Sequence, residues 1–123
     1  MTRPADSFDR RSFDHIGIPT HDEKQGAVWL QPDGVWVTNP RDHPLNVEWV
    51  RYAPDSPMHP RLRESFHLAY RVPDLDKALE RCDVIVPPLD LGGGFATIAF
   101  VDIDGVVVEL MEYADPDERG WVS

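Results

Sequence analysis

Two stretches of this chain repeat each other, and each carries a histidine and then a glutamate on a predicted strand. The first pair is His15 in FDHIGIPT and Glu48 in NVEWVRY, and the second is His67 in SFHLAYRV and Glu109 in VVELMEY. Both glutamate segments read valine, glutamate, two apolar residues, a charged residue and a tyrosine, without a gap. A repeat of this size indicates two similar supersecondary modules. Two imidazoles and two carboxylates at matching positions suit a divalent metal site on a pseudo-two-fold axis.

Composition limits the partners that this chain can have. With 123 residues we expect one domain, and the formal net charge of -10 opposes binding to nucleic acid or to an anionic membrane surface. No apolar run is long enough for a membrane helix. Cys82 is the only cysteine, so no intrachain disulfide can form, which fits a cytoplasmic location. A small molecule is the expected ligand.

The two halves show a similar order of predicted elements. In the first half, alternation and turn residues predict a strand over 13–20, a hairpin of strands 28–31 and 35–38 around Pro32-Asp33-Gly34, and a strand over 46–52. The segment 20–26 is too short and polar for a packed helix. Residues 53–64 hold three prolines and are expected to link the halves.

The second half contains the helix that the first half lacks. A strand over 65–72 precedes a helix that begins after Asp74, a favourable N-cap, and extends to Cys82. Its apolar residues follow the i, i+3, i+4, i+7 pattern, which places Cys82 on the buried stripe and argues against a reactive thiol. A short strand closed by two prolines and a hairpin of strands 96–102 and 106–113 around Asp104-Gly105 complete this half.

This order, with histidine on the first and glutamate on the fourth strand of each half, resembles the vicinal oxygen chelate superfamily. That family includes glyoxalase I, methylmalonyl-CoA epimerase, extradiol dioxygenases and the fosfomycin and bleomycin resistance proteins. The resemblance implies an α+β fold of two βαβββ-type modules, about 13–53 and about 65–113, in one glyoxalase-like domain over residues 1–123. Their strands would form an open, curved, barrel-like sheet, with the first-module helix reduced to a loop.

The resemblance also implies a ligand set for a divalent transition ion. His15 and Glu48 would be the ligands of the first module, and His67 and Glu109 those of the second. Nitrogen and carboxylate ligands suit Zn, Ni, Fe, Mn or Co. Strand alternation places Tyr52 on the face of Glu48 and Tyr113 on the face of Glu109, so both tyrosines are expected to contact substrate.

The implied activity is that of a metal-dependent isomerase, epimerase or lyase. A small substrate with two neighbouring oxygens would react through an enolate-like intermediate, with Glu48 or Glu109 as the base; the sequence does not choose between them. One alternative is a metal-free drug-binding protein of the bleomycin-resistance type. The other is a dioxygenase, which needs only two histidines and one carboxylate.

A homodimer is expected because no helix covers the first module. Alternation gives its outer face Ile16, Ile18, Val47 and Trp49, and the hairpin adds Trp29 or Trp36. An exposed apolar face of this kind commonly marks an association surface. The alternative cover is the N-terminal arm or the tail that contains Trp121.

Overall fold

The chain divides into two compact units in a computed structural model that describes residues 12–91 and 94–115. The N-terminal unit is His15–His67, and the C-terminal unit contains residues 68–91 and 94–115 together with Ser12, Phe13 and Asp14. The expected linker 53–64 belongs to the N-terminal unit. The N-terminal arm and the Trp121 tail lie outside the described residues.

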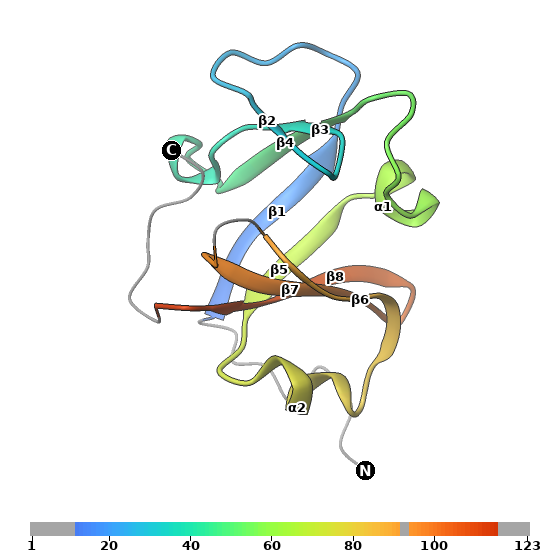
Figure 1. The fold of residues 1–123 in the computed structure, drawn as a ribbon. Coiled ribbons are helices and arrows are strands. Elements are labelled where there is room, and N and C mark those ends of the chain that lie inside the picture. Colours follow the sequence, from blue (N-terminus) through green and yellow to red (C-terminus); the bar gives the residue numbers. More distant parts are fainter. Residues whose placement is uncertain (1–11, 92–93, 116–123) are drawn as a thin grey trace. The chain divides into compact units, whose positions relative to one another are not determined.

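The N-terminal unit has four strands in the order β2-β3-β4-β1 (Figure 1). Strand β1 (Phe13–Pro19) pairs in parallel with β4 (Val47–Tyr52), which places Gly17 opposite Glu48. Strands β2 (Val28–Leu30) and β3 (Val35–Val37) form the predicted hairpin, and β3 pairs antiparallel with β4. The turn of the hairpin requires Gly34, whose φ is 70°.

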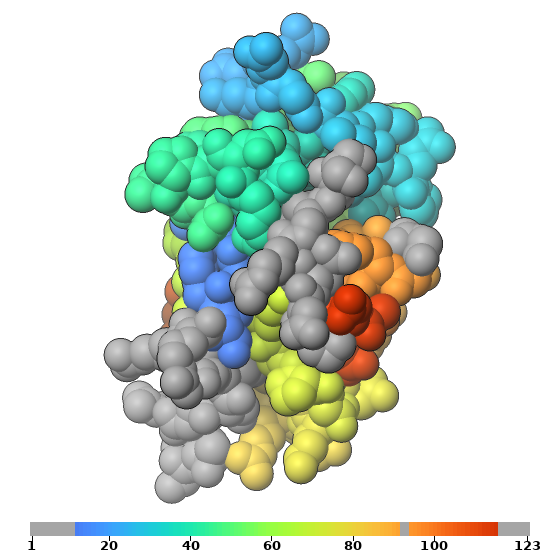
Figure 2. Space-filling view, turned by 90° about the vertical axis from the view of Figure 1, so that its left-hand side faces the viewer, coloured from blue at the N-terminus to red at the C-terminus, as the bar shows by residue number. Residues whose placement is uncertain are grey.

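Loops and short helices complete this unit. No helix follows β1, as predicted; residues 20–27 form a loop from which the Lys24 amine lies 4.4 Å from the centre of the Trp49 ring. The 3-10 turn η3 (Pro40–Asp42) and the loop that follows it, teal in Figure 2, lie at the surface of this unit. Part of the outer sheet face is therefore covered by the unit's own loop.

A short helix within 53–64 was not predicted. Helix α1 (Pro60–Glu64) begins after His59, whose Nδ1 accepts a hydrogen bond from the Arg61 amide at 3.1 Å. Leu62 is 1% exposed and fixes the helix against the unit. The linker interpretation was wrong here because a proline breaks a helix interior but favours the first helical position, which Pro60 occupies.

The C-terminal unit has the strand order β5-β8-β7-β6. It contains β5 (His67–Arg71, of which His67 belongs to the N-terminal unit), α2 (Leu75–Leu79), β6 (Asp83–Asp90), β7 (Ala96–Ile103) and β8 (Val106–Tyr113). Helix α2 packs on β7 and β8 through a cluster that includes Leu75, Val101, Val108 and Leu110. The apolar face of β8 is thus covered by the predicted helix.

Two local predictions in this unit need correction. Helix α2 has the expected cap, since the Asp74 side chain accepts from the Lys77 amide at 3.1 Å, but it ends at Leu79 rather than at Cys82. Strand β6 continues through Pro87 and Pro88 instead of ending there. Among the strands that the structure describes, it pairs with β7 alone. It has register shifts between Val84 and Leu89, an arrangement in which strand prolines are tolerated.

One hydrogen bond occurs at the same place in both units. The Thr20 amide donates to the Val50 carbonyl at 2.8 Å, and the Val72 amide donates to the Met111 carbonyl, also at 2.8 Å. Each donor lies five residues after the repeated histidine, and each acceptor lies two residues after the repeated glutamate. The sequence duplication is therefore a duplication of strand register.

Membrane insertion through a helix is not supported by this fold. Among the described residues, none of the helices has the length and apolar character needed to cross a bilayer.

Candidate metal centre

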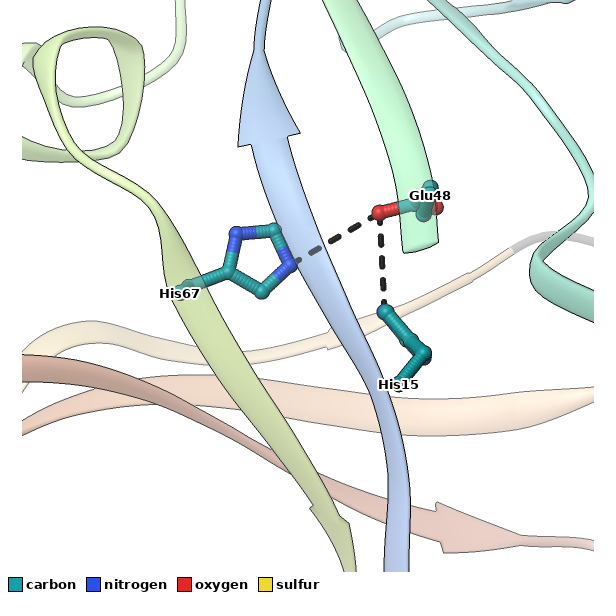
Figure 3. Close-up of side chains that lie close together, drawn as sticks. All are labelled: His15, Glu48 and His67. Atoms are coloured by element: carbon teal, nitrogen blue, oxygen red, sulfur yellow. Dashed lines mark ion pairs between the residues drawn. The ribbon is translucent and has the colours of Figure 1, made fainter. Parts of the chain in front are cut away.

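Three of the four predicted ligands meet within the N-terminal unit. Figure 3 shows His15 on β1, Glu48 on β4 and His67 at the start of β5, with the two imidazoles directed at one carboxylate. Glu48 Oε1 lies 3.5 Å from His15 Nε2 and 3.7 Å from His67 Nε2. One donor atom from each residue lies within 4.8 Å of the others. The three side chains are buried, with exposed fractions of 0%, 4% and 5%.

The strand pairing explains why these side chains converge. Side chains at alternate positions share a face, so His15 and Gly17 project on the same side of β1. Gly17 is the register partner of Glu48 in the parallel pair, so the carboxylate projects beside the glycine rather than beside a second bulky side chain. In this parallel register, Glu48 lies opposite the residue two positions after His15, on the same face of the sheet. The histidine and glutamate of the first repeat therefore lie close together.

Gly17 makes room for the third side chain of this site. The His67 imidazole lies where a side chain at position 17 would project. A Cβ built on Gly17 would lie 2.1 Å from His67 Cε1 and 2.3 Å from its Nε2. Glycine is required at this position because the imidazole lies directly on the backbone of β1, and only a long-range contact reveals this.

The donor set and its spacing fit a transition ion. Two ligands bonded at about 2.0–2.2 Å in a tetrahedral arrangement lie about 3.3–3.6 Å apart. The measured nitrogen–oxygen distances of 3.5 and 3.7 Å are close to that range. A buried carboxylate also needs a compensating positive charge, which an ion shared with two imidazoles supplies. The N-terminal unit thus contains a possible His-Glu-His metal site.

The fourth predicted ligand lies in the C-terminal unit. Glu109 is on β8 and is 4% exposed, with Phe100 of β7 as its register partner. A carboxylate at such a buried strand position is unusual, because a charge there needs hydrogen bonds or an ion. The participation of Glu109 in the metal site remains a prediction.

The two predicted substrate-binding tyrosines have different surroundings. Tyr52, at the end of β4, lines a pocket together with residues that follow β1 and residues of α1. Tyr113 is buried, its hydroxyl donates to Asp14 Oδ2 at 2.9 Å, and its ring packs edge-on against Phe95. The Tyr113 hydroxyl therefore serves a hydrogen-bond network within the C-terminal unit.

Sequence analysis did not identify that network. Asp14, with 2% exposure, accepts from Tyr113 and also from Arg71 Nε at 2.9 Å. The Arg71 guanidinium lies 4.0 Å from the centre of the Tyr113 ring. The partners of Asp14 are 57 and 99 residues away in the chain, so no local pattern signals the network.

Comparisons with known proteins bear on the fold. No family model and no curated protein sequence matches the chain. A solved structure of a hypothetical protein from Bacillus halodurans C-125 matches with a TM-score of 0.56 and 19% identity, over 87% of this chain and 97% of that one. Methylmalonyl-CoA epimerase from Mycobacterium tuberculosis matches with a TM-score of 0.55 and 20% identity, over 85% and 89%.

A third match is more distant. It is a glyoxalase/bleomycin resistance protein/dioxygenase from Nocardioides, with a TM-score of 0.37 and 15% identity over 87% of this chain and 86% of that one, and it carries no argument here. The first two matches span most of both chains and show the fold. The chain therefore shares the fold of these two proteins, an α+β fold built on a curved sheet with few short helices, as the sequence resemblance predicted.

Proposed function

We propose that this protein is a metal-dependent isomerase, epimerase or lyase for a small substrate that chelates the ion through two neighbouring oxygens. The observation that carries the proposal is the buried His15–Glu48–His67 cluster, whose three donor atoms have the spacing of ligands around one transition ion. A purely structural function explains these residues less well, since burying a carboxylate and two imidazoles is costly.

Each residue has a definite task in this proposal. His15 and His67 would bind the ion through Nε2 and Glu48 would bind it through Oε1, with Glu109 as the fourth proposed ligand. When bound, a divalent ion polarises a substrate carbonyl and stabilises the negative charge that develops as the neighbouring proton leaves. Glu48 or Glu109 accepts that proton, since a carboxylate is a competent base for carbon acids next to a polarised carbonyl.

The fold comparison includes an enzyme of the same reaction class. One of the similar structures is an epimerase by name, and an epimerase inverts a carbon centre. At 20% identity this likeness does not carry over a substrate. The class of reaction proposed here therefore depends on the ligand cluster and not on the neighbour's name.

A dioxygenase is the second candidate, and one observation favours it. Two histidines and one carboxylate, the composition of the observed cluster, are the ligand set of non-haem Fe(II) oxygenases. Glu109 distinguishes the two candidates. If the Glu109 carboxylate is a fourth ligand, it reduces the coordination positions available for O₂ and substrate. Three ligands leave those positions open.

Metal analysis followed by solvent exchange tests the proposal. Chelator-treated protein is reloaded with Zn, Ni, Fe, Mn or Co, and we expect about one ion per chain. His15→Ala and His67→Ala should each lower the affinity more than about 100-fold, because changing even an outer-shell partner costs about 10–100-fold. His43→Ala, a histidine outside the cluster, is the matched control. If both cluster variants keep the wild-type metal affinity, the protein binds its metal at another place or has no metal site.

Reaction class is tested on a panel of 2-hydroxy and 2-oxo acids in deuterated water. We expect metal-dependent exchange of a carbon-bound hydrogen, which Glu48→Gln or Glu109→Gln abolishes because an amide cannot accept the proton. Glu80→Gln, at an exposed position, is the control. Oxygen consumption by the iron-loaded protein without any exchange would favour the dioxygenase. If a ligand binds with the same affinity in the presence and absence of metal, the result would favour a drug-binding protein.

A further inference from the structure

A pocket of about 620 Å³ lies at the carboxyl ends of β1 and β4, entirely within the N-terminal unit. The last residues of the two strands and helix α1 form its walls, which include Pro19, His21, Tyr52, Pro60, Arg63 and Glu64. The cluster of His15, Glu48 and His67 is not part of these walls. The pocket is therefore a separate feature, formed where the unpredicted helix meets the strand ends.

The pocket begins next to the metal cluster on the same face of the strands. The His67 imidazole lies over Gly17, and Pro19 is the next residue of β1 on that face, about 7 Å further along at the rise of a β-strand. Tyr52 is two same-face positions beyond Glu48, about 13 Å away by the same rise. Val50, between Glu48 and Tyr52 on that face of β4, is buried in an apolar cluster, so a molecule held at the metal cluster would extend along β1 into the pocket.

Arg63 is the cationic group of this pocket. Its Nη1 and Nη2 donate to the carbonyls of Ser56 and Pro54 at 3.4 and 3.5 Å, which are long and weak hydrogen bonds. Among the described residues, no carboxylate forms an ion pair with Arg63. In a chain of net charge -10, a half-buried guanidinium held only by two long contacts to carbonyls is poised to accept an anion.

We propose that Arg63 binds a terminal carboxylate of the substrate and so determines its class. This inference rests on the proposed function: the substrate is an elongated dicarboxylate whose chelating oxygens lie at the cluster and whose second carboxylate lies in the pocket. The planar guanidinium can form two parallel hydrogen bonds to a carboxylate. These bonds would replace the two long hydrogen bonds of Arg63 to backbone carbonyls. Glu64, which also lines the pocket, disfavours a doubly charged phosphate more than a singly charged carboxylate.

The test uses two series of chelating acids and cobalt-loaded protein. One series runs from 2-hydroxyglutarate to 2-hydroxysebacate, and the other contains the 2-hydroxy monoacids of equal chain length. At the matching length we expect the diacid to bind about tenfold more tightly than its monoacid, the low end for a hydrogen bond to a charged group, because the pocket is open to solvent. Arg63→Gln should remove this difference. Arg61→Gln, on the same helix but outside the pocket, should preserve it.

The outcomes separate this inference from the proposed function. Equal affinities of diacids and monoacids at every length would overturn the inference, and so would a preference for diacids that survives Arg63→Gln. In either case, binding of the monoacids to the cobalt-loaded protein would still support the metal site. Tighter binding of the matching phosphonate would overturn the choice of a carboxylate. The pocket is also tested alone: suberate added to metal-free protein should shift the NMR signal of Arg63 Nε–H and not that of Arg61. If the Arg63 signal does not shift, the inference is overturned, even when no acid binds to the cobalt-loaded protein.

Discussion

Replacing Gly17 by alanine tests the geometry of the metal site with a single methyl group. The φ of Gly17 lies outside the left-handed range, so the backbone itself tolerates alanine. The new Cβ would lie 2.1 Å from His67 Cε1, whereas ordinary van der Waals contact begins at 3.4 Å. The imidazole must therefore move by about 1.3 Å, which far exceeds the tolerance of about 0.2 Å on a metal–ligand bond.

The expected result has a metal component and a stability component. Gly17→Ala should lower metal affinity more than about 100-fold, the effect also expected of His67→Ala, because it displaces the same ligand. It should also lower the free energy of unfolding of the metal-free protein by about 1–3 kcal/mol, the usual cost of overpacking. Competition with a coloured chelator measures the first quantity, and urea denaturation measures the second.

A double-mutant cycle with His67→Ala provides the control. Without the imidazole the methyl group has space, so Gly17→Ala in that background should be neutral or should stabilise by about 0.4–1 kcal/mol through the unfolded state. Wild-type metal affinity in Gly17→Ala would refute the contact between the imidazole and β1. So would an equal loss of stability in both backgrounds.

Three further predictions concern the surroundings of the site. Asp14→Asn should lower the free energy of unfolding by about 2 kcal/mol and Tyr113→Phe by about 1, because Asp14 accepts two hydrogen bonds and Tyr113 donates one of them; equal losses in urea denaturation would contradict a role for the second bond. We propose a homodimer through the outer face of the N-terminal unit, where Trp29 is 39% exposed; Trp49→Glu should give a monomer by light scattering, and a monomeric wild type would exclude it. Burial raises the pKa of the Cys82 thiol, and its Sγ donates to the Ala78 carbonyl; native protein should therefore react with a thiol reagent more slowly than unfolded protein, and equal rates would be inconsistent with this packing.

Much of the strand framework could be predicted from the sequence, because it is encoded locally. Side chains of a strand alternate between its two faces, so the sequence around Glu48 and Glu109 predicts which residues share a face with each glutamate. Glycine turns close both hairpins: Gly34 has a φ of 70°, and Asp104 and Gly105 have φ values of 54° and 84°. The duplication adds a second copy of each signal, so the fold could be predicted although the two structures that share it are only 19% and 20% identical to this chain.

Errors in the helices and in β6 arose where local signals are ambiguous. The prolines of 53–64 indicate an end of regular structure, but Pro60 begins α1, and Leu62 holds that helix by tertiary burial. The apolar stripe from Leu75 continues to Cys82, yet hydrogen bonds of the helical pattern stop near Leu79 and a turn follows. A helix of five residues is too short to be stable from propensity alone, so packing sets its limits.

The sequence by itself determined the residue types of the site and their strands, since histidine and glutamate recur at fixed positions in a repeated, alternating pattern. Only the tertiary structure decided how His15, Glu48 and His67 meet, because their convergence depends on the parallel register of β1 and β4 and on the space over Gly17. It alone also brought Arg63 to a pocket beside Tyr52 and joined Asp14 to Tyr113. Such contacts join residues far apart in the chain, and no period of a strand or helix encodes a distance through space.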